Sequence, residues 1–165
     1  MCSSDLGDSA GGGLALAFVL ALRDAGESLP AGCMLASPWL DLSRDRRAVP
    51  RLVRRELMLT PDWLEACALA YAPRADWAAP SVSPLLAEHG GLPPLLIQAA
   101  SDELLAPDAE RLAASASAAV ADVTYTRWPA LWHDFVLQPG LVAAADSAVA
   151  QAAWFVATVT GSSRP

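Results

Sequence analysis

The sequence contains no lysine, few cysteines and no long hydrophobic run. All 11 basic residues are arginine, which, together with the abundance of alanine, indicates the codon usage of a GC-rich genome rather than a chemical role. Cys2, Cys33 and Cys67 are odd in number and far apart. They therefore predict neither a disulfide framework nor a zinc site.

Membrane spans and nucleic-acid binding are also excluded by what is missing. The longest apolar stretches, such as residues 14–22, fall short of the roughly 18–20 residues that cross a bilayer. The net charge of −7 and the pI near 4.6 leave no basic surface for phosphate contacts. Residues 1–6 lack the basic start and apolar run of a secretory leader, so the expected location is the cytoplasm.

What is present suffices for a folded core. The chain has 165 residues, 54% of them hydrophobic, which excludes disorder because apolar burial offsets the entropy of ordering. The length suits one domain or part of a larger single domain.

Short apolar runs alternate with helical stretches along the chain. We expect strands at 32–37, 95–99 and 122–128, and helices at 14–25, 61–71 and 107–121, with a last helix ending near Thr158. Strands separated by helices predict a parallel sheet and an α/β fold. Even with one more strand at the N-terminus this sheet is thin for a parallel sheet covered on both faces, which suggests half of a larger fold.

The pentapeptide Gly7-Asp8-Ser9-Ala10-Gly11 fits G-x-S-x-G, the nucleophile elbow. Such a turn lifts the serine hydroxyl above the sheet, and glycines two residues before and after it remove Cβ atoms that would collide. Ser9 is the predicted nucleophile. The N–H of Ala10, at the start of the following helix, is a predicted oxyanion donor.

A nucleophilic serine needs a base and an acid. The chain has two histidines. His89 lies in a polar turn and is expected to be solvated, whereas His133 follows the last strand and is the predicted general base. Asp102 and Glu103 directly follow a strand, and the residues alone do not choose between them. Acids elsewhere near the site are interpreted as helix-cap or loop acids, and these are Asp8, Asp108 and Asp134.

With these residues assembled, the chain resembles the bacterial hormone-sensitive-lipase-like esterases (family IV) of the α/β-hydrolase superfamily. The resemblance extends from Gly7 to Phe155 and implies a Ser-His-acid hydrolase that acts through an acyl-enzyme on short-chain acyl esters, without metal or organic cofactor. The family acid usually lies nine residues past the second proline of a Pro-Pro pair, which from Pro94 gives Glu103, with Asp102 as the alternative. The matching stretches are Gly-Asp-Ser-Ala-Gly-Gly (7–12), Ser-Pro-Trp-Leu-Asp-Leu (37–42), Ser-Pro-Leu (83–85), Leu-Pro-Pro-Leu-Leu-Ile (92–97), Ser-Asp-Glu-Leu-Leu (101–105), and Trp-Pro followed by His-Asp-Phe (128–129 and 133–135).

The chain also departs from the family. The His-Gly-Gly-Gly oxyanion loop, the N-terminal cap and the first strands have no counterpart in it. We therefore expect the C-terminal half of an α/β-hydrolase fold at 7–160, a tail at 161–165, and a non-native leader at 1–6. Its residues Cys-Ser-Ser-Asp-Leu are what a nucleotide string resembling a common sequencing adapter would encode. A chain without that loop is expected to be aggregation-prone and no faster on p-nitrophenyl acetate than its Ser9→Ala variant.

Two other readings stay open. An amide or thioester hydrolase would use the same three residues. A non-catalytic module could bind an acidic partner through a run of arginines, although the acids interleaved with them favour a solvated loop. These arginines are Arg44, Arg46, Arg47, Arg51, Arg54 and Arg55.

An exposed edge strand at 122–128 (Asp122 to Trp128) predicts a homodimer.

Overall fold

Four parallel strands form the sheet in this computed structural model, which describes residues 4–119 and 121–161. The strands are β1 (Ser4–Asp8), β2 (Gly32–Ala36), β3 (Leu95–Ala100) and β4 (Val123–Trp128), in the spatial order β1-β2-β3-β4. Each pairs in parallel with the next, so the four carboxyl ends meet at one edge of the sheet. The predicted α/β class is confirmed.

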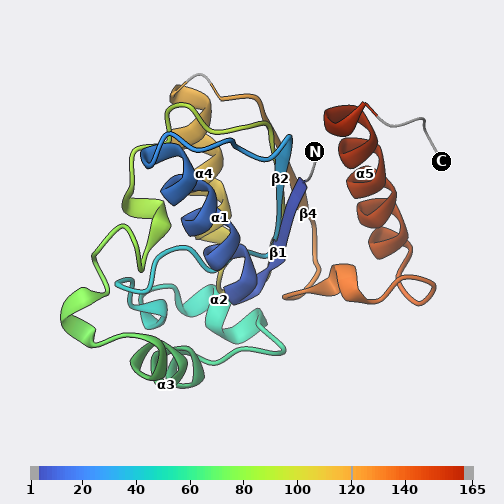
Figure 1. Cartoon of the computed structure of the whole chain (residues 1–165). Helices are drawn as coiled ribbons and strands as arrows, with labels where there is room; N and C mark the ends of the chain where they lie inside the picture. Colours follow the sequence, from blue (N-terminus) through green and yellow to red (C-terminus); the bar gives the residue numbers. More distant parts are fainter. Residues whose placement is uncertain (1–3, 120, 162–165) are drawn as a thin grey trace.

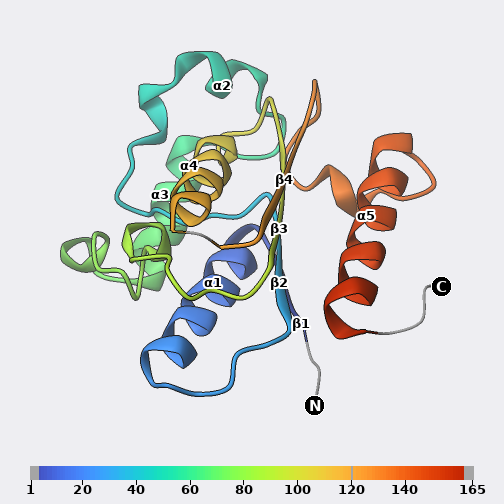
Figure 2. The same ribbon diagram turned by 90° about the horizontal axis from the view of Figure 1, so that it is seen from above.

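Helices cover both faces of this sheet. Helices α1 (Ser9–Asp24) and α4 (Ala106–Ala118) pack on one face, and α5 (Ala143–Thr160) packs on the other (Figures 1 and 2). Two further helices, α2 (Pro50–Arg55) and α3 (Pro61–Tyr71), lie in the long connection between β2 and β3, on the same side as α1 and α4 (Figure 2). This connection forms one wall beside the carboxyl edge of the sheet.

The central strands carry the core. Every residue of β2 and β3 is buried, as expected for parallel strands covered on both faces. Leu35 and Ile97 belong to the cluster that α1 and α4 cover, whereas Met34 and Leu96 pack with Phe155 of α5. Alternate residues thus point to the two faces, which explains why both strands are mainly apolar in the sequence. Gln98 is the polar exception in β3, and its side chain donates to the Ala148 carbonyl of α5.

Helix boundaries differ from expectation mainly at α1. The sequence predicts a helix from residue 14, but α1 begins at Ser9 and includes the glycines at 11–13. A Cβ on Gly12 would lie 2.8 Å from the Cβ of Pro38, and one on Gly13 would lie 2.4 Å from the Trp39 oxygen. The glycines are therefore helical residues that let α1 approach the turn after β2 closely.

The strand β1 includes residues 4–6, part of the segment expected to be foreign to the protein. Ser4 to Asp8 pair in register with Gly32 to Ala36, which needs only backbone groups. The side chains fit less well, since Leu6 is 64% exposed and one carboxylate oxygen of Asp5 is buried without a hydrogen bond. The origin of this segment stays a prediction, and residues 1–3 and 162–165 lie outside the described part.

Two expectations about polar residues were wrong. His89 is 3% exposed rather than solvated, because its ring lies 2.8 Å from the Ser115 hydroxyl and 3.1 Å from the Pro84 carbonyl. Asp108 is neither a helix cap nor a loop acid, because it lies inside the first turn of α4 and its fully buried carboxylate binds both terminal nitrogens of Arg46 at 2.7 and 2.8 Å. Arg46 is itself 5% exposed, so the interpretation of the arginine run as a solvated loop fails at this position.

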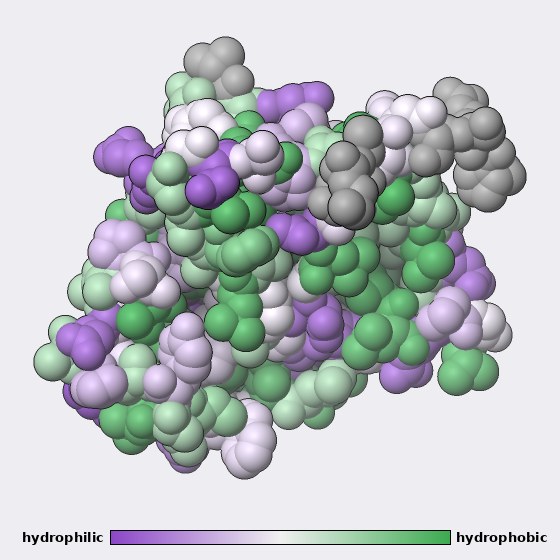
Figure 3. Space-filling view, viewed as in Figure 1, coloured by the Kyte–Doolittle hydropathy of each residue, from purple (hydrophilic) through white to green (hydrophobic). Residues whose placement is uncertain are grey.

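Apolar side chains are exposed along the free edge of β1. Figure 3 shows them gathered over α1 and between α1 and α5. Leu6 of β1 and Leu14 and Phe18 of α1 are each more than half exposed. The expectation of an unpaired inner edge with an apolar face beside it agrees with the described residues.

Candidate active site

The turn between β1 and α1 holds Ser9 in a strained conformation. Its φ is 50°, in the left-handed region that non-glycine residues rarely adopt and that concentrates at functional sites. A Cβ on Gly7 would lie only 2.2 Å from the Gly11 carbonyl oxygen, whereas one on Gly11 would find nothing closer than 3.9 Å. The expected steric need for glycine therefore holds at Gly7 and is wrong at Gly11.

The turn after β2 supports this elbow from the side. The Trp39 N–H donates to the carbonyl oxygen of Ser9 at 2.9 Å. Because α1 carries glycine where it meets this turn, the helix start and the strand end are held together by backbone contact. Ala10, the next residue, lies in the first turn of α1, where helix N–H groups lack intrahelical acceptors.

His133 bridges two other side chains at the carboxyl edge of the sheet. Its Nε2 lies 2.9 Å from the Ser9 Oγ, and its Nδ1 lies 2.9 Å from a carboxylate oxygen of Glu103. The three residues follow β1, β3 and β4, and the imidazole is 2% exposed. Ser9 and His133 are 124 positions apart in the chain, so the topology of the sheet brings them together.

The two candidate acids face different partners. Glu103 is fully buried, and its second oxygen accepts the Ala100 N–H at 3.0 Å. Asp102 turns outward and binds Arg55 at 3.0 and 3.2 Å. The structure thus brings Glu103, and not Asp102, to the imidazole.

Two residues at the site had no catalytic or positioning role predicted from the sequence. Ser37 follows β2 with a φ of 46° and is 1% exposed. Its hydroxyl accepts the Asp134 N–H at 3.2 Å and is hydrogen-bonded to Glu103. Asp134, expected to be a loop acid, has a carboxylate oxygen 3.1 Å from Nε2 of His133. The available signal was position, because both residues follow predicted strands at the carboxyl edge.

Burial and the neighbouring carboxylates act in opposite directions on the imidazole. Burial alone would lower the pKa of His133, but contacts with Asp134 and Glu103 raise that pKa to about 9. Burial raises the pKa of Glu103, and hydrogen bonds from His133, Ser37 and the Ala100 N–H oppose this rise. The site therefore favours a protonated imidazole held between carboxylates.

Other nucleophile and metal chemistry finds little support in the described residues. Burial raises the pKa of the Cys33 thiol to about 12, which leaves it an unreactive core group. The part of the chain that the structure describes holds no group of three or more histidine, cysteine or acidic side chains that could bind a metal ion.

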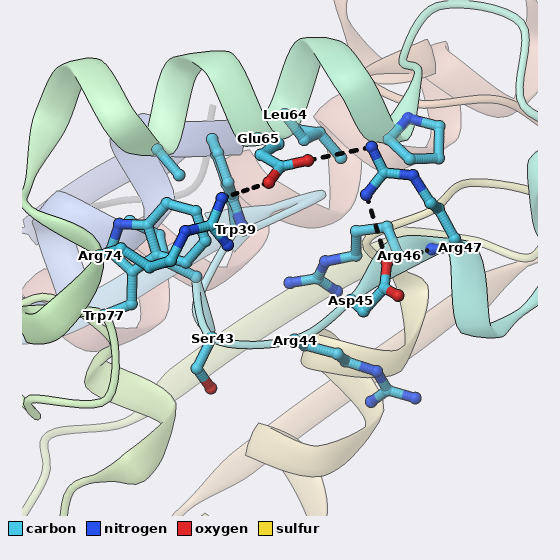
Figure 4. Close-up of a pocket in the computed structure, with 13 residues that line it drawn as sticks. Trp39, Ser43, Arg44, Asp45, Arg46, Arg47, Leu64, Glu65, Arg74 and Trp77 are labelled. Atoms are coloured by element: carbon cyan, nitrogen blue, oxygen red, sulfur yellow. Dashed lines mark hydrogen bonds and ion pairs between the residues drawn. The ribbon is translucent and has the colours of Figure 1, made fainter.

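Two cavities lie along the long connection between β2 and β3, and one of them is also lined by α1. One of about 130 Å³ begins at Ala10 and has a mainly apolar lining from α1, α3 and the turn after β2. The other, of about 280 Å³, is lined by both polar and apolar side chains. In Figure 4 Arg47 and Arg74 converge on Glu65 from opposite sides of it. Trp39, Leu42 and Ala68 line both cavities and separate them.

Half of the arginines in the run pair with acids of the same chain. Arg47 pairs with Asp62, Glu65 and Asp45, and Arg55 pairs with Asp102. With Arg46 bound to Asp108 as well, three of the six guanidinium groups have acidic partners. The acids paired with these three arginines reduce the positive charge that the run offers to an acidic partner.

Comparison with known proteins identifies the fold family of the chain. Residues 6–137 match the family of the alpha/beta hydrolase fold. The chain belongs to the α/β-hydrolase fold family. This hydrolase-fold chain is 39% identical to an acetyl-hydrolase of Streptomyces hygroscopicus over 94% of its own length and 52% of the relative, and 32% identical to an esterase of Acinetobacter venetianus over 93% and 51%.

Solved structures give the same result for the hydrolase-fold chain. An esterase from the bacterial hormone-sensitive lipase (HSL) family superposes with a TM-score of 0.90 at 32% identity, over 95% of this chain and 53% of that one. The resemblance to this family is confirmed. The chain spans about half the length of the curated relatives that it matches. No helix among residues 4–119 and 121–161 is long and apolar enough to cross a bilayer.

Proposed function

We propose that the protein is a carboxylic-ester hydrolase with Ser9 as nucleophile, His133 as general base and Glu103 as the acid of the triad. The observation that carries the proposal is the pair of 2.9 Å contacts from the His133 imidazole to the Ser9 hydroxyl and the Glu103 carboxylate. The names of the related acetyl-hydrolase and esterases support it. Glu103 is preferred to Asp102 because Asp102 faces Arg55.

The first half-reaction forms an acyl-enzyme. Neutral His133 accepts the Ser9 proton on Nε2 as Oγ attacks the ester carbonyl carbon, and Glu103 stabilises the imidazolium through Nδ1–H. The Ala10 N–H donates to the oxyanion. The tetrahedral intermediate then collapses as Nε2–H passes its proton to the departing alkoxide, leaving the acyl group on Ser9 and releasing an alcohol.

The second half-reaction restores the serine. Water replaces the alcohol, and His133 accepts a proton from it as its oxygen attacks the acyl carbon. On collapse, Nε2–H returns a proton to the Ser9 oxygen and a carboxylic acid leaves. The balance needs one water and no cofactor.

The apolar cavity beside Ala10 supports a short acyl chain. Because Ala10 lines this cavity, we expect the chain of an acyl group on the Ser9 Oγ, with its oxyanion on the Ala10 N–H, to enter it. At about 130 Å³ it is smaller than the roughly 300–1,000 Å³ of sites for drug-sized ligands. An ethyl fluorophosphonate should therefore react with Ser9 faster than an octyl fluorophosphonate does.

Turnover by the chain on its own is expected to be low. The loss of one oxyanion donor costs about 10²–10³ in rate, and from the described residues the elbow offers the Ala10 N–H. We expect p-nitrophenyl acetate hydrolysis no faster than that of Ser9→Ala. Reaction with a fluorophosphonate requires a single event per molecule and so detects an activated serine without turnover.

The test is covalent labelling of the 165-residue chain. An ethyl fluorophosphonate should add to Ser9, located by peptide mass spectrometry, and the adduct should be absent from Ser9→Ala and at least 10²-fold slower to form in His133→Gln. Ser147→Ala, which alters an exposed serine of α5, is the matched control and should label like the parent. The proposal is contradicted if Ser147→Ala loses labelling as completely as Ser9→Ala does, or if Ser9→Ala is still labelled.

Assembly and location stay predictions. β4 is the last strand in the described sheet order, and we propose that this edge pairs with its copy across a two-fold axis. An Arg127→Pro variant, altered at an exposed β4 residue whose N–H faces the free edge in this register, should then lower the molar mass measured by light scattering from dimer to monomer. A cytoplasmic location likewise stays a prediction.

A further inference from the structure

The loop after β4 brings a second carboxylate to the imidazole. One oxygen of Asp134 lies 3.1 Å from Nε2 of His133, the same nitrogen that lies 2.9 Å from the Ser9 hydroxyl. Glu103 occupies Nδ1 on the opposite side of the ring. The imidazole thus has a carboxylate at each of its nitrogens.

The backbone directs the Asp134 side chain back onto the ring. Its φ of 53° and ψ of 30° are left-handed, a conformation in which aspartate and asparagine are enriched among non-glycine residues. Its N–H is fixed by the Ser37 hydroxyl at 3.2 Å. Although Asp134 precedes the short helix at Phe135–Leu137, its side chain does not cap that helix, so the usual role of an aspartate at this position is not performed.

The Asp134 carboxylate is buried with one oxygen unpartnered. The side chain is 9% exposed, and its Oδ1 is buried with no hydrogen bond from any described residue. A shielded carboxylate is costly unless a positive group compensates it. His133 is the group that contacts its other oxygen.

The state of the ring decides whether these contacts attract. A neutral imidazole carries one proton. If that proton is on Nδ1 and is donated to Glu103, the lone pair of Nε2 faces a carboxylate oxygen of Asp134, and two acceptors repel each other. An imidazolium donates to both carboxylates. We propose that Asp134 is a positioning residue that retains a proton on Nε2 of His133 in the resting site, so that Ser9 becomes activated only after this proton has left.

This inference rests on the proposed function only in taking Ser9 as the nucleophile, and it predicts two opposed effects. With Asp134 present, deprotonation of the resting imidazolium by solvent base needs a higher pH. Once the ring is neutral, the Ser9 proton moves to Nε2 and Asp134 stabilises the imidazolium so formed. Removing the carboxylate should therefore extend labelling to lower pH and reduce its rate at the high-pH plateau.

The other ionisable groups around the ring do not replace Asp134. Glu103, from the turn after β3, faces Nδ1, and Tyr125 of β4 interacts electrostatically with Glu103. Ser9 and Ser37 contribute hydroxyls from the turns after β1 and β2. Asp102 is turned to Arg55.

The test is an NMR titration of the histidine rings. The chain has two histidines, so their signals separate readily, and the absence of one in His133→Gln assigns the other to His89. The parent His133 should titrate well above 6.5, near 9, with Nε2 protonated at pH 7. Asp134→Asn should lower the midpoint by about 1 unit or more, and the acid limb of ethyl fluorophosphonate labelling should move with it.

A control and a second variant keep the test decisive. Asp134→Gly tolerates positive φ and should move the midpoint in the same direction, whereas Asp102→Asn, an equal change of charge, should not move it. An unmoved midpoint in both Asp134 variants, or an unprotonated Nε2 in the parent at pH 7, overturns the proposal. If Ser9 labels at no pH the proposed function fails instead, because the titration needs no catalysis.

Discussion

The carboxyl edge of the sheet and the arginine-rich segment at 44–55 are both dense in charge but differ in how that charge is held. At the sheet edge, side chains from separate turns meet with burial nearly complete, as His133 and Glu103 do. In the segment, Arg47 and Arg55 are about half exposed and pair with nearby acids. Exposed pairs contribute little and need little precision, so convergence of buried groups, rather than charge density, marks the site.

Adjacent residues divide between these two regions. Glu103 contacts His133 at the sheet edge, whereas Asp102 pairs with Arg55 of the arginine-rich segment. One peptide bond thus separates an acid that orients an imidazole from an acid in a surface ion pair. The variants below sharpen or break the contrast, beginning with the largest expected effect.

Gly7→Ala should be the most disruptive change at the sheet edge. Its Cβ would meet backbone of Gly11 at 2.2 Å, so the elbow must move, and we expect insoluble chain without Ser9 labelling. Gly11→Ala is the matched control, since its Cβ has no contact closer than 3.9 Å and alanine favours a helix by up to about 1 kcal/mol. The thermal midpoint of Gly11→Ala should equal or exceed that of the parent. Equal loss of soluble protein and of Ser9 labelling in both variants would contradict a steric need for glycine at Gly7 alone.

Glu103→Gln should slow fluorophosphonate labelling of Ser9 by about 10³-fold or more, because an amide cannot compensate the imidazolium. Asp102→Asn should change the labelling rate less than twofold, since it loses only the contact with Arg55. Labelling reactions quenched at successive times and analysed by intact-protein mass spectrometry give both rates. A larger loss in Asp102→Asn than in Glu103→Gln would reverse the assignment of the acid.

Much of this site could be predicted from order and position along the chain. Ser9, His133 and an acid follow strands, and parallel strands bring those positions to one edge. What residue order could not supply was the side-chain direction that separates Asp102 from Glu103, because neighbouring turn residues have no fixed periodicity. The burial of His89 and Asp108 was missed for a similar reason, since their partners Ser115 and Arg46 are distant in sequence.

Arg46 is an exception to the contrast between buried groups at the sheet edge and exposed ion pairs in the arginine-rich segment. It is the buried member of the run and binds Asp108, which also accepts the N–H groups of Leu40 and Asp41. Arg46→Met leaves this carboxylate without its cation and should cost about 3–5 kcal/mol of unfolding free energy. Arg47→Met, at an exposed site, should leave the urea midpoint unchanged. Equal urea midpoints for the two variants would show that burial does not distinguish them.

The last expected effect is the pH dependence of stability, which should come mainly from the sheet edge below pH 9, while the raised pKa of the buried Cys33 thiol adds a fall of the same sign above it. The pKa of His133 is raised from 6.5 to about 9 in the folded chain, so the folded state binds the proton more tightly than the unfolded state. Its stabilisation is complete below about pH 6.5 and is lost as the pH rises through about 9. The raised pKa of buried Glu103 acts with the same sign, whereas Glu65, paired with Arg47 and Arg74, has a lowered pKa and stays ionised over this interval. The free energy of unfolding in urea should therefore be lower at pH 9.5 than at pH 6.5 for the parent and for Arg47→Met, with a smaller difference for Asp134→Asn. Equal values at the two pH values for the parent would mean that the imidazole carries no bound proton in the resting fold.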